Sequence, residues 1–510
     1  MATAKLTPLS KLLITLLVVG GIGFTLYKLS GNKKIMESIG SKETSETISS
    51  DAINIGVVTW GGYAGGQYFN EGFKANEESR FFKEYGFKVN FEVLDDFEAS
   101  RDAFKNGKID LLWATIDALP TEMEGLAQYD PQVVFQADWS RGGDAIVARR
   151  GINTINDLKG LKIAVAPMTP SHSFLLWMLD AADLTVNDIK IVEVPSAIDA
   201  ADAFKNNSVD AAVVWSPDDK DCVTKVPGAR ILQSTKNASH IIADVFIAKK
   251  KFLQENKEKL QKLYEGWMIG ASELNQNDEN KVKASKILAE GLNQPEDFCL
   301  DAINNVRLAT HGDNLDFFGL NRDYTGVTGE ELYNKMKIKY DAIGYKTANV
   351  RSWRLVASDI INGVKLEGEQ HNSEGIKVFN AATKEDVTAE ALSSKKVTIS
   401  FRSGEFTLDE NSMQIIDLKF TSIAKAFSNA KIRIEGNTDN VGSRKSNIAL
   451  SKRRAQAVAD YLISKHQMPA NRFIIVGNGP DKPIAGCENN DTEDCKSKNR
   501  RTDFEIIANE

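Results

Sequence analysis

A nine-residue segment that occurs twice constrains the fold of this chain more than any other feature. Residues 102–110 (DAFKNGKID) return as residues 202–210 (DAFKNNSVD), and the runs LLWATID and AAVVWSPD follow them directly. Each copy has the pattern of a helix end that leads into a buried strand, and alternation of helices and strands predicts an α/β fold. We therefore expect two similar lobes, each delivering polar residues from the far end of its strand to a shared cleft.

Further segments in the middle of the chain carry a resemblance to a known family. They are GKIDLLWATIDALP (107–120), DWSRGGDAIVAR (138–149), INDLKGLKIAVAPMTPSHSFL (155–175) and HGDNLDFFG (311–319). This layout resembles the periplasmic solute-binding proteins of the nitrate, sulfonate, taurine and thiamine-precursor group. The resemblance implies a two-lobed periplasmic-binding-protein fold, which we expect over residues 51–368. The lysine-rich segments 252–274 and 278–291 are expected to be amphipathic helices that cover the second lobe and the hinge.

In that fold a solute binds between the lobes, at the carboxyl ends of strands and the amino ends of helices. The helix start at Ser171 favours an anion, whereas Asp117 and Asp144 favour an amine, so we expect a zwitterion or a small polar ring stacked on a tryptophan. Structural roles are the alternative, with the tryptophans as core, Ser171 as a helix cap and Asp117 as a partner of its own loop. The residues expected at the solute are Trp60, Gly61, Thr115, Asp117, Asp144, Ser171, His172 and Trp215.

An enzymatic role is the less favoured alternative for this middle region. The thiamine-pyrimidine synthases share the solute-binding fold, and they would require a reactive histidine and metal-binding thiols in the cleft. His172 is the only histidine near a predicted cleft element, and no cysteine cluster accompanies it. We therefore expect a domain that is not an enzyme and that uses no cofactor.

A second informative stretch, NTDNVGSRKSNIALSKRRAQAV, occupies residues 437–458. It has the pattern of a strand end, a loop that contains Asp439, and a helix from about Ser443. Asn447, Ser451 and Arg454 share one stripe of that helix because they are spaced by four and three residues. An aspartate accepts hydrogen bonds from an ammonium group and an arginine grips a carboxylate, so the two suit an amino acid group. The alternative is that Asp439 caps the helix and that Arg454 is a solvated charge.

The motifs of this region resemble those of the OmpA-like peptidoglycan-binding domain. They are T-D-x-x-G at 438–442, N-x-x-L-S at 447–451, R-A-x-x-V at 454–458 and N-R-R at 499–501. The resemblance implies a small α+β domain over residues 397–510, in which Asp439 and Arg454 bind the diaminopimelate of the peptidoglycan stem peptide. It also places Thr438, Asn447 and Ser451 at that site. Asn437 departs from the family pattern, because many members have histidine before Thr-Asp.

The N-terminus contains the uncharged run LLITLLVVGGIGFTLY at residues 12–27, with lysines on both sides. The run is short for a membrane span, which needs about 20 residues, but apolar neighbours and flanking lysines extend it. We expect a transmembrane anchor over residues 1–30 and a flexible tether over 31–50. A cleaved secretory signal is the alternative, although residues 27–29 are too bulky for a signal peptidase. A wall-binding domain acts outside the cytoplasm, so we expect a single-pass inner-membrane protein with most of its chain in the periplasm.

Charge and cysteine content narrow the partners further. The formal net charge of -7 makes nucleic acid an unfavourable partner, and the five histidines are scattered, so no metal site is expected. Cys487 and Cys495 lie eight positions apart in the loop CENNDTEDC, and we expect them to form a disulfide that export would permit. Cys222 and Cys299 either pair or stay free.

These observations predict a non-enzymatic envelope protein with an inner-membrane anchor, a solute-binding domain, a linker at residues 369–396 and a peptidoglycan-binding domain. The alternative is a passive or stator-like subunit of a membrane complex that is anchored to the cell wall. A stator subunit needs an ionisable residue in its membrane span, and residues 12–27 contain no acidic or basic side chain. A passive partnership with a membrane-embedded complex stays open.

Overall fold

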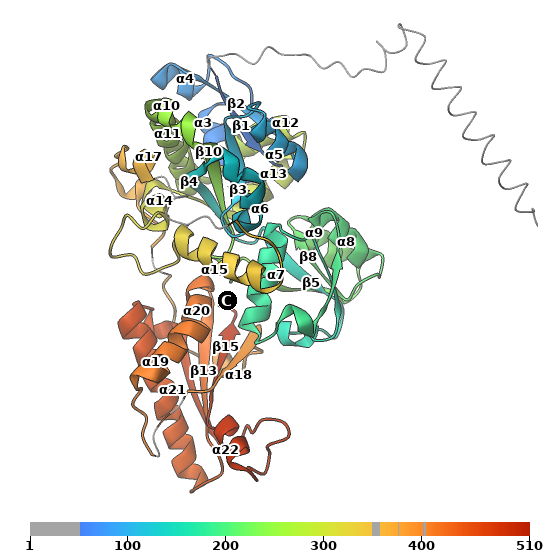
Figure 1. Cartoon of the computed structure of the whole chain (residues 1–510), viewed down its shortest axis with the longest axis vertical. Coiled ribbons are helices and arrows are strands. Elements are labelled where there is room, and N and C mark those ends of the chain that lie inside the picture. The colour runs from blue at the N-terminus through green and yellow to red at the C-terminus, as the bar shows by residue number, and fades with distance from the viewer. Residues whose placement is uncertain (1–51, 349–357, 376, 400, 402–403, 510) are drawn as a thin grey trace, which may run out of the picture. The chain divides into compact units, whose positions relative to one another are not determined.

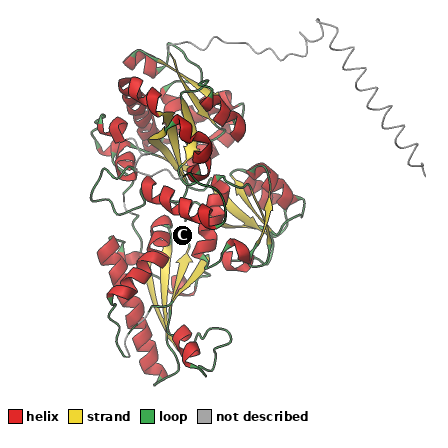
Figure 2. Ribbon diagram, viewed as in Figure 1, coloured by secondary structure: helices red, strands yellow, loops and turns green. Residues whose placement is uncertain are grey.

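The computed structural model describes residues 52–348, 358–375, 377–399, 401 and 404–509. In this part of the chain, strands and helices alternate through the first two sheets, as the sequence predicts for an α/β fold (Figure 1). The strands form sheets of six, five and four strands. Figure 2 shows helices packed against each of these sheets.

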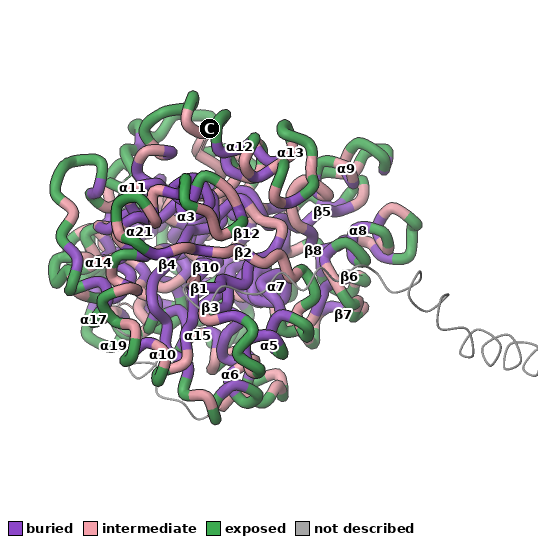
Figure 3. The backbone as a smooth tube through the Cα atoms, turned by 90° about the horizontal axis from the view of Figure 1, so that it is seen from above, coloured by how far each residue is buried: buried purple, intermediate pink, exposed green. Residues whose placement is uncertain are grey.

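The six-stranded sheet forms the core of the first lobe and has the order β11-β4-β10-β3-β1-β2. Every residue of β3 and of β4 is buried, because helices cover both faces of these central strands. Figure 3 shows β1, β3, β4 and β10 of this sheet inside the buried part of the molecule. The strands are β1 (Ala52–Val57), β2 (Lys88–Val93), β3 (Leu111–Thr115), β4 (Pro131–Ser140), β10 (Ala243–Lys249) and β11 (Val306–Leu308).

Helices predicted from their lysine-rich amphipathic pattern pack on this first lobe. The prediction that they cover the second lobe and the hinge was therefore wrong. The longest of them, α11, lies against α3, where a Cβ at Gly66 would come within 2.3 Å of the Trp267 ring. An amphipathic pattern shows that a helix has an apolar face, but it does not show which sheet that face meets. The helices of this lobe are α3 (Ala64–Phe69), α4 (Arg80–Tyr85), α5 (Phe97–Lys105), α6 (Leu119–Leu126), α10 (Lys250–Glu255), α11 (Lys257–Gln276), α12 (Asp278–Leu292), α13 (Glu296–Asn304), α14 (His311–Phe317) and α17 (Ser358–Asn362).

The five-stranded sheet forms the second lobe and has the order β7-β6-β8-β5-β9. The chain enters it directly from β4 through the short crossover 141–143. The strands are β5 (Asp144–Ala148), β6 (Lys162–Val165), β7 (Lys190–Glu193), β8 (Ala211–Trp215) and β9 (Arg230–Ser234). The helices are α7 (Pro170–Ala181), α8 (Ala197–Lys205) and α9 (Asp218–Lys225), and α15 (Gly329–Ala342) bonds to α7 through Tyr340 and Ser173 at 2.9 Å.

The repeated segment has the same structural role in both lobes, which confirms its interpretation as a helix end that leads into a strand. Asp110 accepts a hydrogen bond from the backbone nitrogen of Asn54 at 2.9 Å, and Asp210 accepts one from Lys162 at 2.8 Å. Each aspartate thereby joins the start of its own strand to the neighbouring parallel strand. Gly107 and Asn207 end the two helices with φ of 74° and 62°, a conformation that glycine and asparagine tolerate best.

The four-stranded sheet of the C-terminal region has the order β12-β15-β13-β14. Its strands are β12 (Ser393–Val397), β13 (Lys431–Asn437), β14 (Phe473–Gly479) and β15 (Thr502–Ile507). The long helix α21 (Arg444–His466) packs on β13 and β14, where Gly436 and Gly477 allow its backbone to approach closely. The other helices are α18 (Lys384–Thr388), α19 (Glu410–Ile416), α20 (Ser422–Ala426) and α22 (Glu493–Asn499), with a π-helical turn at Asp417–Thr421.

Two predictions concern the segments beside these sheets. Strand β12 begins at Ser393, inside the segment predicted as a linker, because residues 393–397 pair with β15. The predicted anchor and tether lie outside the described residues. Within the residues that the structure describes, no helix has both the length and the apolar character needed to cross a membrane.

The disulfide predicted between Cys487 and Cys495 is present, with the two Cα atoms 5.1 Å apart. Cys222 and Cys299 are free and buried. Asn499 holds the same loop independently, since its Nδ2 donates to the Cys487 carbonyl at 2.9 Å and its Oδ1 accepts from the backbone nitrogen of Ile484 at 2.7 Å. The bridge therefore reinforces a loop that side-chain hydrogen bonds already fix.

Replacing Cys487 and Cys495 together with serine is expected to lower the unfolding free energy of this region by about 2–3 kcal/mol, because the unfolded loop regains conformational freedom. Denaturant titration of the oxidised chain, with and without reductant, measures the effect. The double variant is the control and should not respond to reductant. Equal stability of the oxidised and reduced chain would contradict a stabilising bridge.

Candidate functional site

Asp439 lies in the loop between β13 and α21, as the sequence predicts. The residue is 8% exposed. Its Oδ1 accepts a hydrogen bond from the backbone nitrogen of Val441 at 3.1 Å, and its Oδ2 accepts one from Arg500 Nη1 at 2.8 Å. Ser443 caps α21, because its Oγ accepts from the backbone nitrogen of Ser446 at 3.1 Å. The carboxylate of Asp439 therefore does not cap the helix, as the alternative interpretation of this stretch required it to do.

Arg454 lies on α21 and is buried with only 6% of its surface exposed. Its Nε donates to the carbonyl oxygen of Glu405 at 3.0 Å, and its guanidinium carbon is 4.8 Å from the centre of the Phe401 ring. Burial lowers the pKa of Arg454, the Asp439 carboxylate opposes that shift, and Arg500 adds to it. The side chains of Asp439 and Arg454 thus lie within one another's electrostatic field.

The other three residues predicted at this site hold its loop and helix together. Asn447 donates from Nδ2 to the carbonyl of Val441 at 3.0 Å, and Thr438 donates from Oγ1 to the carbonyl of Asp439 at 2.8 Å. Ser451 is fully buried and accepts from the backbone nitrogen of Gly479 at 2.9 Å. The Ser451 hydroxyl thus holds α21 and β14 together.

Sequence reasoning missed Arg500 as a member of this site. Besides Asp439, it bonds to Glu493, with 2.7 Å between Nη2 and Oε1. Its neighbour Arg501 instead pairs with Asp503 within the sheet at 2.9 Å. The N-R-R motif was the available signal, but the motif alone does not show which of its two arginines faces Asp439.

Two cavities lie at the strand ends between the two lobes. The larger has a volume of about 740 Å³, and the smaller has about 30 Å³. They share Val58, Thr59 and Trp215, so they adjoin one another. The smaller cavity is lined by Trp60, Trp113, Thr115, Asp144, Trp215 and Asp244, among others.

Four of the predicted solute-binding residues therefore line the smaller cavity: Trp60, Thr115, Asp144 and Trp215. Trp60 Nε1 donates to Asp138 Oδ2 at 3.0 Å, and its ring covers the crossover between the lobes. A Cβ at Gly143 would lie 2.0 Å from Cη2 of Trp60. The first lobe thus touches the crossover through this indole ring.

The other four predicted residues line neither of these cavities. Gly61 packs its backbone on α13, since a Cβ there would lie 2.3 Å from the carbonyl of Ala302. His172 is 1% exposed and stands edge-on between the rings of Tyr340 and Tyr345, at centroid distances of 5.4 and 5.3 Å. Burial lowers the pKa of His172 to about 4. Gly61 and His172 therefore have packing roles in this structure, and their predicted contact with a solute stays a prediction.

Ser171 and Asp117 are also fully buried, and their polar side-chain atoms make no hydrogen bond that meets normal geometry. The Ser173 hydroxyl lies near Asp117 and lowers its pKa somewhat, but burial is the larger effect and raises that pKa well above its ordinary value. Ser171 does not cap α7 through its side chain. Both residues are thus buried without lining either cavity.

Asp138 and Asp244 were not predicted, and both sit with Asp144 at the strand ends. Burial raises the pKa values of all three, to about 7 for Asp144 and Asp244 and well above the ordinary value for Asp138. The signal that could have found Asp244 is a lone carboxylate at the start of the apolar run ADVFIAK, where only a paired or protonated group is tolerated.

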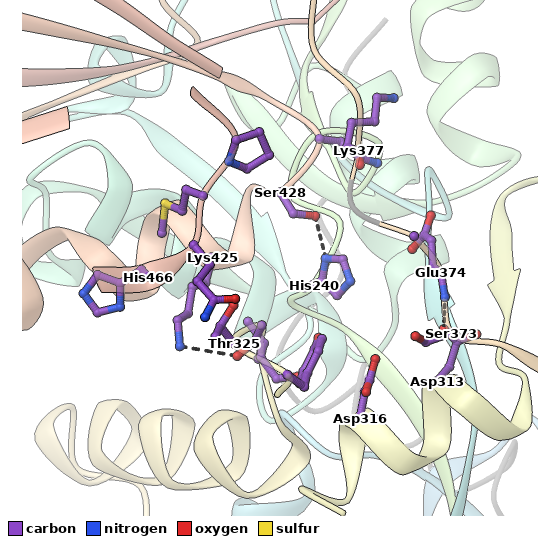
Figure 4. Close-up of a pocket in the computed structure, with 18 of the residues that line it drawn as sticks. His240, Asp313, Asp316, Thr325, Ser373, Glu374, Lys377, Lys425, Ser428 and His466 are labelled. Atoms are coloured by element: carbon purple, nitrogen blue, oxygen red, sulfur yellow. Dashed lines mark hydrogen bonds between the residues drawn. The ribbon is translucent and has the colours of Figure 1, made fainter. Parts of the chain in front are cut away.

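A third cavity, of about 360 Å³, is lined by residues of 313–327 on one side and by residues of 425–429 and 466–472 on the other (Figure 4). A hydrogen bond of 2.7 Å joins Ser428 Oγ and His240 Nδ1, and Lys425 Nζ donates to the Gly326 carbonyl at 3.4 Å. Burial holds the pKa of His240 well below its ordinary value, and Arg141 and Arg472 lower it further. These groups bond to one another across the cavity, so we place the candidate ligand sites in the two regions above.

Comparison with known proteins identifies both regions. Residues 53–289 match the NMT1-like family, and residues 400–500 match the OmpA family. A peptidoglycan-associated lipoprotein from Rhizobium meliloti (strain 1021) is 37% identical over 103 residues, which cover 20% of this chain and 56% of that protein. The chain spans about half the length of the curated relatives it matches.

Solved structures similar to the first two lobes include two periplasmic binding proteins. The aliphatic sulphonate binding protein SsuA from Escherichia coli has 19% identity and a TM-score of 0.47, over 62% of this chain and 100% of SsuA. The nitrate-binding protein NrtA from Synechocystis PCC 6803 has 14% identity and a TM-score of 0.48, over 63% of this chain and 91% of NrtA. By these matches, residues 53–289 of this chain are similar to the NMT1-like family, and residues 400–500 are similar to the OmpA family.

Proposed function

We propose that this chain is a non-enzymatic envelope protein that binds peptidoglycan through residues 397–510 and a small solute between the lobes of residues 51–368. The observation that carries the first part is the placement of a buried carboxylate, Asp439, and a buried guanidinium, Arg454, in one another's field. The match to a peptidoglycan-associated lipoprotein supports the same reading.

Diaminopimelate presents an ammonium and a carboxylate on one carbon, and the two side chains offer complementary charges. An ammonium donates up to three hydrogen bonds, which an aspartate accepts, while the planar guanidinium of an arginine suits a carboxylate. Because both groups are buried, water screens these contacts less than it would at an open surface. The amino acid end of the stem peptide is therefore the part of peptidoglycan that we assign to this site.

Arg500 holds the place that the ligand's ammonium group would take. Its side chain is 36% exposed and bonds to Asp439 and to the exposed Glu493. Because Arg500 has this second partner, it can leave Asp439 and remain paired with Glu493. Exchange of one cation for another keeps the buried carboxylate paired throughout.

The solute-binding part rests on the two adjoining cavities at the strand ends. The larger volume, about 740 Å³, is in the range that holds small-molecule ligands. Residues from both lobes line it, including Thr59 and Arg101 from the first and Pro195 and Trp215 from the second. A solute held there would contact both lobes at once and favour the closed arrangement.

The membrane part of the proposal comes from the sequence alone. The uncharged run at residues 12–27 would anchor the chain in the inner membrane, with the following residues in the periplasm. The disulfide between Cys487 and Cys495 is compatible with an oxidising compartment.

Replacing Asp439 with asparagine is expected to reduce retention on purified diaminopimelate-type peptidoglycan at least tenfold, because the ligand's ammonium loses its counter-charge. Arg454→Gln is expected to have a similar effect through the ligand's carboxylate. Co-sedimentation of the full chain with peptidoglycan sacculi measures both. Asp481→Asn is the matched control, since it removes an exposed aspartate that pairs with Arg444 at the start of α21. Retention of both site variants at the normal level would remove the assignment.

A screen of small nitrogen- and sulfur-containing solutes is expected to find at least one that raises the melting temperature of the full chain. The effect should disappear in Trp215→Ala, because Trp215 lines both cavities. Ile338→Ser is the control, since Ile338 is 68% exposed and lines neither cavity. A broad library without a single stabilising solute would reject the receptor role.

Exchanging residues 1–30 for a cleavable signal peptide is expected to convert the protein from a membrane-bound to a freely extractable periplasmic form, because the apolar run would be lost. Cells are first treated with a peptidoglycan-digesting enzyme, so that binding to the wall no longer retains the protein, and fractionation then measures how much of it stays with the membrane. The unaltered chain, treated identically, should stay in the membrane pellet. Release of the unaltered chain would contradict the anchor.

A further inference from the structure

Three adjacent strands bring polar side chains together at the wall of the smaller cavity. Asp244 on β10 lies opposite Thr115 of β3 on one side and opposite Asp138 of β4 on the other. Directly opposed residues of antiparallel strands point to the same face, with Cβ atoms about 5 Å apart. Two carboxylates at that separation repel one another unless a proton or a cation lies between them.

Asp144 adds a third carboxyl group from the second lobe. It begins β5 and lies opposite Trp215 of β8. Asp144 and Asp244 both line the smaller cavity, so the two lobes supply one acidic group each. The cavity therefore lies between carboxyl groups that belong to different sheets.

Only neutral side chains donate hydrogen bonds to these three carboxyl groups in the described part of the chain. Tyr63 Oη donates to Asp244 at 2.5 Å, Trp60 Nε1 donates to Asp138 at 3.0 Å, and Ser140 Oγ donates to Asp144 at 2.7 Å. Nearby cations have other partners: Arg101 makes two bonds to Glu122, at 2.6 and 2.9 Å, and Arg141 pairs with Glu374. Among the described residues, no cationic side chain therefore bonds directly to these three carboxyl groups.

Buried polar atoms without partners provide an independent sign of a ligand. Thr115 Oγ1 and Trp113 Nε1 lack any hydrogen bond, although Thr115 is 3% exposed and Trp113 is 2% exposed. Both residues line the smaller cavity. An unpartnered buried polar atom costs about 1–3 kcal/mol, so such atoms are expected where a ligand completes the bonding.

Aromatic rings complete the enclosure. Trp60, Trp113 and Trp215 line the same cavity, and the faces of indole rings attract cations. Arg101 already uses Trp113 in this way, with its guanidinium carbon 4.5 Å from the ring centre. The wall thus combines carboxyl groups with indole rings.

We propose that the solute carries a primary ammonium group, which binds in the smaller cavity between Asp144, Asp244 and Thr115. The inference deepens the solute-binding function proposed above and rests on it. A primary ammonium has three donors, and these three side chains present oxygen acceptors around a cavity of about 30 Å³, which is large enough for a group of that size. The rest of the solute extends into the larger cavity.

The larger cavity has a charge distribution that suits a solute with a cationic group. Its acidic lining residues outnumber the basic ones, and Arg101 is already paired with Glu122. Thr59 donates to Asp95 from both its backbone nitrogen and its hydroxyl, at 2.7 and 2.9 Å. The acidic residues of this lining are Asp95, Asp96, Glu98, Glu122 and Asp218, and the basic ones are Arg101 and Lys105.

Isothermal titration of the full chain in detergent tests the proposal with ethanolamine and putrescine as primary ammonium probes. Choline tests a bulky quaternary ammonium, and ethanesulfonate and nitrate test anions. We expect a primary ammonium to bind and the anions to give no heat. Asp144→Asn and Asp244→Asn should each weaken that binding at least tenfold. The control is Asp202→Asn, which removes an exposed aspartate at the start of the second repeat copy and should leave the binding unchanged.

Protonation gives a second readout. Burial raises the pKa of Asp144 and of Asp244 to about 7, so both are largely protonated below that pH and must ionise to bind a cation. Affinity for the ammonium probe should therefore rise from pH 5.5 to pH 8. The unfolded chain releases the protons of Asp144 and Asp244 at lower pH than the folded chain does. The unliganded chain should therefore lose stability between pH 5.5 and pH 8, and each asparagine variant, which lacks one of these carboxyl groups, should lose less. The other titratable or charged groups that act on this cluster are Tyr63, Asp117, Asp138, Arg141 and Asp219.

The outcomes separate this inference from the broader function. Binding of ethanesulfonate, nitrate or only a neutral solute would overturn the ammonium assignment and leave a solute receptor in place. Binding of choline in preference to ethanolamine and putrescine would overturn the primary ammonium. If no solute of any class binds, both the inference and the receptor role fail. The melting temperature of each asparagine variant at pH 5, where the native carboxyl groups are neutral, shows that the variant is folded.

Discussion

Removing a charged group from water is costly, and this cost shapes both candidate sites. In the C-terminal region, the buried carboxylate of Asp439 accepts hydrogen bonds from Arg500 and from a backbone N–H group. Between the lobes, the buried carboxyl groups of Asp144 and Asp244 receive hydrogen bonds from neutral donors, and their pKa values rise. The same physical cost is thus met by pairing in one region and by protonation in the other.

Much of the C-terminal region could be predicted from the sequence because its signals are local. The order of strand, loop and helix around Asp439 follows from hydrophobic spacing, and α21 begins within one residue of the predicted start. The Cys487–Cys495 pair lies within one short loop. Arg500 escaped prediction because its partner Asp439 is distant in sequence, and only the folded loop shows which arginine turns toward it.

The cleft between the lobes was harder to predict because its wall is assembled by strand register. Trp60, Asp144 and Trp215 were found from their positions after or before apolar runs. Asp244 meets Asp138 and Thr115 only because β10 lies between β4 and β3, antiparallel to both. No local pattern encodes that order, since β10 follows β3 by more than a hundred residues. The same limit explains why α11 and α12 were assigned to the wrong lobe.

The contact between Trp60 and Gly143 has a consequence for how the two lobes can move. Gly143 belongs to the crossover that joins the sheets, and the indole ring leaves no room for a side chain there. Rotation of one lobe relative to the other would change backbone angles in this crossover and slide it under the ring. The environment of the Trp60 ring would then change with the hinge angle, so closure of the lobes would alter the packing and the polarity around this indole.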